Sequence, residues 1–133
     1  MATSPLQTFL FADLAGFTAL TEVHGDEQAA DLVERFCAQA REALPSYDAD
    51  EVKAIGDALL LHSADAAQAV RLAHHLARNI GGNHGFPGVR VGVHTGPAVE
   101  RGDDWFGATV NLASRVSGAA AAGEVLVLSL IHI

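Results

Sequence analysis

Two stretches of the chain repeat apolar residues in steps of three and four, and each stretch lies between short runs of mostly apolar residues. The repeats cover residues 29–44 and 66–80. This spacing places the apolar side chains along one face of a helix. We expect Asp26 to cap the first helix and the second helix to begin near Asp65. Each helix must bury its apolar face, and the neighbouring short runs can supply the partner surface as strands.

The short apolar runs predict the strands and their order in the chain. We expect strands at residues 8–14, 51–55, 58–62 and 89–94. Gly56-Asp57 is the two-residue loop of a hairpin, and a Gly- and Asp-rich loop at 95–104 precedes a helix at 110–118 and a strand at 124–128. The order predicts an α+β fold, a ferredoxin-like βαββαβ core with an added helix and strand. We expect a largely antiparallel sheet with helices on one face and the other face free for a ligand or partner.

The composition limits the classes of function. The 133 residues suit one domain, and half of them are apolar, so a core can form. A formal net charge of −8 argues against nucleic acid as a partner, because phosphate contacts need clustered Lys and Arg. The sequence contains no apolar run of the roughly 18 residues needed to cross a membrane and no secretory signal, so we expect a cytoplasmic protein. The single Cys37 excludes an internal disulfide and a cysteine zinc site.

Two aspartates lie at turns that the predicted fold brings together. Asp13 lies near the end of the first strand, and Asp57 lies at the tip of the hairpin. Because the first strand and the strand at 58–62 are expected to be neighbours, the two carboxylates can meet at one edge of the sheet. Two acids in contact repel each other unless a cation lies between them, and Mg²⁺ is suited to carboxylates and substrate phosphates. Either residue taken alone is also a common turn residue.

The turn after Asp13 is a candidate phosphate site. The chain passes from strand to helix through Gly16, where the absence of a side chain lets backbone N–H groups approach an anion. Gly16, Phe17 and Thr18 are therefore candidate substrate-binding residues. The pattern is less specific than a Walker A motif, which does not occur in the chain.

Four sequence blocks appear in order: F-A-D-L-A-G-F-T at 11–18, V-K-A-I-G-D-A at 52–58, V-R-V-G-V-H-T-G at 89–96 and D-W-F-G-A-T-V-N-L-A-S-R at 104–115. Together they resemble the catalytic domain of class III adenylate and guanylate cyclases over nearly the whole chain. Each block alone is only suggestive, whereas four in order at this spacing are specific. The resemblance implies an adenylate cyclase that converts ATP to 3′,5′-cyclic AMP and pyrophosphate.

The resemblance also implies the roles of the metal-binding and base-reading residues. It makes Asp13, Asp57 and the backbone carbonyl of Leu14 ligands of two divalent metal ions, Mg²⁺ or Mn²⁺. It pairs Lys53 with Asp104 as the residues that read the purine. A lysine donates to adenine N1 and an aspartate accepts from the N6 amine, so this pair favours adenine. Guanylate cyclases of the family usually carry Glu and Cys or a similar pair instead.

The remaining implied residues act on the ribose and the reacting phosphate. Asn111 corresponds to the residue that orients the ribose, and Arg115 to the arginine that stabilises charge on the α-phosphate when the ribose 3′-oxygen attacks it. These residues are four apart, so one helix face can present both. In the family the metal ligands and the base readers of one site come from different subunits. The resemblance therefore implies a homodimer with shared active sites and ATP as its ligand.

The resemblance is incomplete at the C-terminal end. The family domain normally continues with another pair of strands that carry a cation for the triphosphate. The last six residues do not resemble that continuation, so we interpret 1–127 as an incomplete cyclase domain and 128–133 as a candidate non-native tail.

Other functions and roles remain open from the sequence. A non-catalytic nucleotide-binding or dimerisation module is one alternative, and a guanylate cyclase is another. His94 is interpreted as structural, because no ligand set surrounds it in sequence. Trp105 and Phe106 are interpreted as core or interface anchors.

Overall fold

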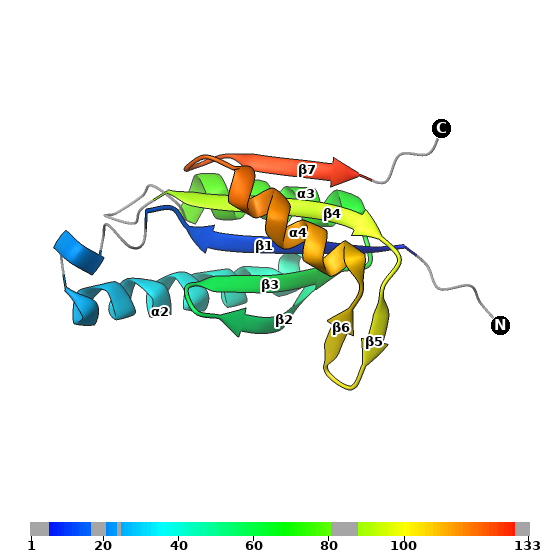
Figure 1. Cartoon of the computed structure of the whole chain (residues 1–133), viewed down its shortest axis with the longest axis horizontal. Helices are drawn as coiled ribbons and strands as arrows, with labels where there is room; N and C mark the ends of the chain where they lie inside the picture. The colour runs from blue at the N-terminus through cyan, green and yellow to red at the C-terminus, as the bar shows by residue number, and fades with distance from the viewer. Residues whose placement is uncertain (1–5, 17–20, 24, 81–87, 130–133) are drawn as a thin grey trace.

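The computed structural model of the chain describes residues 6–16, 21–23, 25–80 and 88–129. The chain forms a five-stranded sheet and a separate two-stranded hairpin. Figure 1 shows helices on both faces of the sheet and the hairpin projecting from one end. The strands of the sheet are β1 (Gln7–Leu14), β2 (Ala49–Ile55), β3 (Ala58–Ser63), β4 (Val89–Gly96) and β7 (Val125–Ser129). Their order is β2-β3-β1-β4-β7, with β4 and β7 parallel and the other neighbours antiparallel. The predicted α+β architecture is confirmed.

Helices α2 (Asp26–Ala43) and α3 (Ala66–His75) pack on one face of the sheet, as predicted. A 3₁₀ turn, η1 (Leu44–Tyr47), follows α2, and a π-helical turn, η2 (Leu76–Ile80), extends α3. The main core lies between these helices and the sheet, where Leu10, Phe36 and Leu72 are fully buried. No helix in the described part of the chain is long and apolar enough to cross a bilayer.

The helix starts follow local capping chemistry. The Asp65 carboxylate accepts hydrogen bonds from the backbone N–H groups of Ala67 and Gln68, so the predicted start of α3 is confirmed. The N-cap of α2 is Gly25 rather than the predicted Asp26, which is the first residue of the helix. An acid in the first turn still interacts favourably with the helix dipole.

The second face of the sheet is not free, which corrects one prediction. Helix α4 (Ala108–Ala119) lies across β4 and β1 on this face. Ala113 of α4 is buried with Phe9 and Leu60 in a smaller second core. The close approach depends on Gly92, because a Cβ added there would lie 2.1 Å from the backbone nitrogen of Ser117. Side chains alternate between the two faces along β1, so Leu10 lies in the main core and Phe9 in the second core.

The segment predicted as a loop at 95–104 is also different in the structure. Strand β4 continues to Gly96, and the chain then forms a hairpin of β5 (Val99–Arg101) and β6 (Asp104–Phe106). Gly102, at φ 60°, occupies the turn, where a glycine adopts positive φ without strain. Two three-residue strands are too short to produce a recognisable alternating pattern in the sequence.

Candidate active site

The two candidate metal-binding acids lie beside each other. Asp13 is paired in register with Ala58, the residue that follows Asp57, so the β2–β3 turn brings Asp57 next to the end of β1. Gly56 has φ 59° in this two-residue turn, as the predicted hairpin requires. Burial raises the pKa of Asp57, and the negative charge of Asp13 raises it further, while a backbone hydrogen bond and Arg90 lower it. The arrangement concentrates negative charge at one end of the sheet.

Arg90 is a charged residue of this cluster that the sequence analysis did not identify. It lies on β4 directly opposite Asp13, and its Nε donates to Asp13 Oδ1 at 2.8 Å while Nη2 lies 3.4 Å from Oδ2. The hydrogen bond to Asp13 raises the pKa of Arg90, so the guanidinium stays charged. The sequence did contain a signal for Arg90, which is the one charged residue in the otherwise apolar run V-R-V-G-V at 89–93. Its partner Asp13 could not be identified from that run, because the pairing depends on β1 and β4 being neighbours in the sheet.

The donor set at this end of the sheet suits a hard cation with few protein ligands. Among the residues that the structure describes, no group of three or more His, Cys, Asp or Glu side chains gathers. Two carboxylates fit Mg²⁺, which usually takes one or two carboxylates, substrate phosphates and water. Leu14 buries its side chain in the main core, which leaves only its backbone carbonyl as a candidate ligand. Gly16 follows in an exposed turn at φ 72°, whereas the predicted substrate-binding Phe17 and Thr18 lie outside the described residues.

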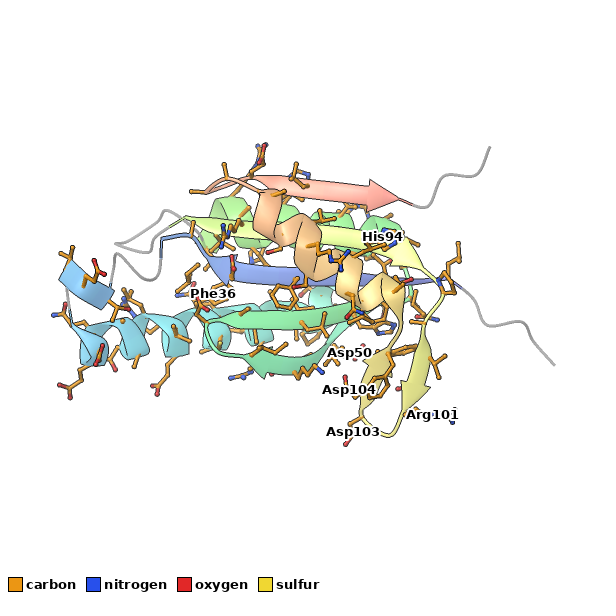
Figure 2. All side chains as sticks on the ribbon, viewed as in Figure 1. Phe36, Asp50, His94, Arg101, Asp103 and Asp104 are labelled. Carbon is orange, nitrogen blue, oxygen red and sulfur yellow. The ribbon has the colours of Figure 1, made fainter. Side chains whose placement is uncertain are left out.

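The predicted purine-reading residues meet in the structure. Lys53 Nζ donates to Asp104 Oδ2 at 2.9 Å, although the residues belong to β2 and β6. The hydrogen bond from Lys53, and then one from the Trp105 backbone N–H to Oδ1 at 2.8 Å, lower the pKa of Asp104. The carboxylate therefore remains an ionised acceptor at neutral pH. Figure 2 shows Asp103 and Asp104 on the projecting hairpin.

Asn111 and Arg115 lie on the exposed side of α4. Both residues are exposed, whereas Thr109, Ala113 and Ser117 of the same helix are buried against the sheet. Their spacing places both side chains on one helix face, as predicted. The helix therefore presents an amide and a guanidinium away from the sheet.

The two groups of candidate residues lie at different places on the sheet. Lys53 lies inside β2, paired with Leu60 of β3, whereas Asp57 lies in the turn beyond the end of β2 at Ile55. In Figure 1 the β5–β6 hairpin and the β2–β3 turn lie at opposite ends of the sheet. The single chain therefore does not gather the acids and the base-reading pair at one point.

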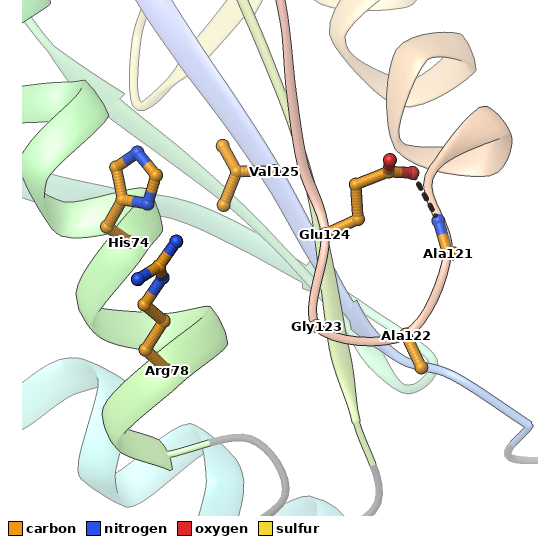
Figure 3. Close-up of a pocket in the computed structure, with 7 residues that line it drawn as sticks. All are labelled: His74, Arg78, Ala121, Ala122, Gly123, Glu124 and Val125. Carbon is orange, nitrogen blue, oxygen red and sulfur yellow. Dashed lines mark hydrogen bonds between the residues drawn. The ribbon is translucent and has the colours of Figure 1, made fainter.

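A groove of about 420 Å³ lies elsewhere, between α3, η2 and the turn that leads into β7. Figure 3 shows His74 and Arg78 on the helical side and the segment 121–125 on the other. None of the candidate active-site residues lines this groove. His94, on β4, is buried, in agreement with its interpretation as structural.

The chain is similar in sequence to known adenylate cyclases. The chain is 42% identical over 120 residues to the pH-sensitive adenylate cyclase MT1302 of Mycobacterium tuberculosis, an alignment that covers 90% of this chain and 30% of that protein. It is 39% identical over 117 residues to an adenylate cyclase of Streptomyces griseus, with 88% of this chain and 29% of that protein covered. The chain thus spans about 30% of the length of these curated relatives.

A solved structure has the same fold. An adenylate cyclase from Trypanosoma brucei in its monomeric state superposes with a TM-score of 0.80 at 25% identity, covering 92% of this chain and 72% of that one. The sequence model described as the adenylate and guanylate cyclase catalytic domain matches residues 3–132, nearly the entire chain. The chain belongs to the adenylate and guanylate cyclase catalytic domain family.

Proposed function

We propose that this domain is an adenylate cyclase that converts ATP to 3′,5′-cyclic AMP and pyrophosphate in the cytoplasm. The observation that carries the proposal is the Lys53–Asp104 ion pair at 2.9 Å. Its donor and acceptor match the acceptor N1 and the donor N6 amine of adenine, and guanine has the opposite pattern. The names of the relatives from M. tuberculosis and S. griseus support adenylate rather than guanylate cyclase activity.

The acids at the β2–β3 end would hold two divalent metal ions, Mg²⁺ or Mn²⁺. Asp13 and Asp57, with the carbonyl of Leu14, are the proposed ligands, and domains of this family generally use divalent metals. When bound, such ions favour deprotonation of the ribose 3′-hydroxyl and neutralise the charge of the triphosphate. Arg90 donates a hydrogen bond to Asp13, so its positive charge would lie near the phosphates of a nucleotide bound through these metals.

The residues of α4 would act on the ribose and the reacting phosphate. Asn111 would orient the ribose so that the 3′-oxygen faces the α-phosphate in line with the leaving pyrophosphate. Arg115 would stabilise the negative charge that develops on the phosphate. Both are exposed and turned away from the sheet of their own chain, which supports contact with a nucleotide held by another subunit.

A homodimer with shared active sites follows from this arrangement. One subunit would contribute Asp13 and Asp57, and its partner would contribute the base-reading pair and the exposed face of α4. The position of Lys53 inside β2, away from the turn that holds Asp57, supports this division. A two-fold axis would create two equivalent sites.

The experiment is to incubate the purified chain with ATP or GTP, with and without Mg²⁺ or Mn²⁺, and to identify the products by mass spectrometry. We expect cyclic AMP from ATP only when a divalent metal is present. Cyclic GMP as the main product would contradict the assignment of adenine. Nucleotide binding without any product would contradict cyclase activity and favour the non-catalytic alternative.

A further inference from the structure

The hairpin that carries Asp104 is held only weakly by its own hydrogen bonds. Strands β5 and β6 have three residues each and form a two-stranded sheet of their own. A hairpin of this size is not stable by itself. The Lys53–Asp104 ion pair adds little, because its side chains are 43% and 32% exposed. The hydrogen bond from Thr109 Oγ1 to the Pro97 carbonyl, at 2.6 Å, fixes only the base of the hairpin.

Trp105 supplies the missing anchor. Its indole ring stacks on the His62 imidazole, with ring centroids 4.6 Å apart and an interplanar angle of 22°. The same indole meets Phe9 edge to face at 5.6 Å and 69°. Trp105 thus connects β6 to β3 and β1 through two aromatic contacts and packs against the second core.

The His62 ring is itself fixed on both sides. Its Nδ1 lies 3.0 Å from Asp50 Oδ1 on β2, and its Nε2 lies 2.6 Å from Gln7 Oε1 on β1. The side chain of His62 is only 12% exposed. Polar contacts at both nitrogens, together with this burial, restrict the orientation of the ring on which Trp105 stacks.

The position of Trp105 determines the position of the Asp104 carboxylate. One carboxylate oxygen accepts from the backbone N–H of Trp105, and the other accepts from Lys53. A displacement of the Trp105 backbone would therefore rotate the carboxylate that faces the base. Lys53 lies on β2 and would not move with it.

We propose that Trp105, stacked on His62, is a positioning residue that sets the selectivity of the domain for adenine over guanine. The inference rests on the proposed function, since it assigns Asp104 to the purine. In this role Trp105 acts on the base through Asp104 and not on the reacting phosphate. Its loss should therefore change the affinity for ATP and the preference for ATP over GTP more than the rate of the chemical step.

The test compares Trp105→Ala and Trp105→Phe with Phe106→Ala, a control on the same strand whose side chain is 52% exposed. For Trp105→Ala we expect the ratio of kcat/KM for ATP to that for GTP to fall about 10-fold, mainly through KM for ATP, as for the loss of one hydrogen bond. Trp105→Phe keeps a ring over His62 and should retain most of the ratio. Phe106→Ala should leave the ratio unchanged, even if it weakens self-association.

His62→Leu is a second variant that keeps the tryptophan. Trp105 is the only tryptophan in the sequence, so its emission reports the stack without any nucleotide. We expect His62→Leu to shift this emission and to lower the ATP-to-GTP ratio in the same direction as Trp105→Ala. Unchanged emission in His62→Leu would overturn the stack.

The outcomes separate the inference from the proposed function. An active, ATP-selective wild type with an unchanged ratio in Trp105→Ala overturns the inference and leaves the function standing. If the wild type makes no cyclic nucleotide, the dissociation constants of ATP and GTP, measured by calorimetry, replace the kinetic ratio. Failure of both nucleotides to bind the wild type would contradict the inference together with the function.

Discussion

Burial and the charge of Asp13 raise the pKa of Asp57 above the ordinary value for an aspartate, despite the opposing effects of a backbone hydrogen bond and Arg90. Between the ordinary pKa and the raised one, the folded state binds more protons than the unfolded state. The free energy of unfolding therefore falls as the pH rises through this interval, and it stays reduced at neutral pH. The ionised Asp57 thus costs stability in the absence of a cation.

Asp57→Asn should stabilise the metal-free protein at pH 7 and remove the activity. The amide carries no charge, so its thermal unfolding temperature should exceed that of the wild type at pH 7, with a smaller difference near pH 4. Cyclase activity should fall by at least about 100-fold, because mutation of residues that only support the metal ligands already lowers metal affinity or activity by about 10- to 100-fold. Thermal unfolding with and without Mn²⁺, together with product assays, measures both effects.

The matched control is Asp31→Asn, an exposed acid on α2. It should change neither the unfolding temperature nor the activity appreciably. A stabilisation by Mn²⁺ that is as large in Asp57→Asn as in the wild type would exclude Asp57 as a metal ligand.

The base-reading pair offers a prediction about specificity. Lys53→Glu combined with Asp104→Cys replaces the pattern for adenine with one found in guanylate cyclases of the family. Cyclic AMP formation should fall by about 100-fold or more, because the N1 and the N6 amine of a bound adenine would lose their hydrogen-bond partners. Formation of cyclic GMP should rise, as measured from the products of equimolar ATP and GTP.

Asp103→Asn, which alters the neighbouring exposed acid, is the control for this exchange. It should keep the selectivity of the wild type. If the double variant retained the ATP preference, the Lys53–Asp104 pair would not be the purine reader.

At the scale of elements, the contact of α4 with β4 determines where Asn111 and Arg115 lie. Gly92 allows the helix backbone to pack directly on the strand, since an added Cβ would lie 2.1 Å from Ser117 N and 2.6 Å from the Ala113 carbonyl oxygen. These are backbone atoms, which a change of rotamer cannot relieve. A larger residue at position 92 must move the helix.

Gly92→Ala should therefore weaken both folding and activity. Overpacking of this kind typically costs about 1–3 kcal/mol of unfolding free energy. A shift of α4 by about 1 Å could cost up to about 100-fold in rate, because the residues that face the nucleotide move with the helix. Denaturant unfolding and kcat/KM for ATP measure the two effects.

Gly118→Ala is the control on the same helix. A Cβ added at Gly118 would meet no other described part of the protein within 4 Å, its own helix backbone and chain neighbours apart. The substitution should be neutral or stabilise the helix by up to about 1 kcal/mol, with unchanged activity. Equal effects of the two alanines would contradict the packing role of Gly92.

At the scale of the whole molecule, the acids and the base-reading pair lie at different places on the sheet, and this separation predicts complementation between inactive variants. Arg115→Ala should lose about 100- to 1,000-fold in activity, and Asp57→Asn should be inactive as argued above. A mixed dimer of the two contains one site in which all residues are native. Random exchange of subunits should restore about a quarter of the wild-type activity.

The measurement is cyclic AMP formation after the two variants are mixed and equilibrated, against each variant alone at the same total concentration. Asp57→Asn taken alone through the same mixing and equilibration gives the background activity. Recovery should increase with protein concentration, since it depends on association. No recovery from dimers that demonstrably exchange subunits would contradict shared active sites.

Much of this architecture could be predicted from local signals. The apolar stripe of α2, the Asp65 cap of α3 and the Gly56-Asp57 turn are encoded in neighbouring residues, and the structure confirms them. The family resemblance named Lys53 and Asp104 as the purine-reading residues, and the structure places their side chains 2.9 Å apart. The roles of these residues in binding metal and nucleotide stay predictions.

Tertiary structure decided what depends on contacts between distant segments. The Arg90–Asp13 pair, the packing of α4 on Gly92 and the stack of Trp105 on His62 join residues that are far apart in sequence. Periodicity gives the apolar face of each element but not its neighbour, so it could not show that α4 covers the second face of the sheet. Local sequence patterns were sufficient to predict the elements and the candidate chemistry. Strand order and helix packing established which charges and rings meet, because those contacts form only when the chain folds.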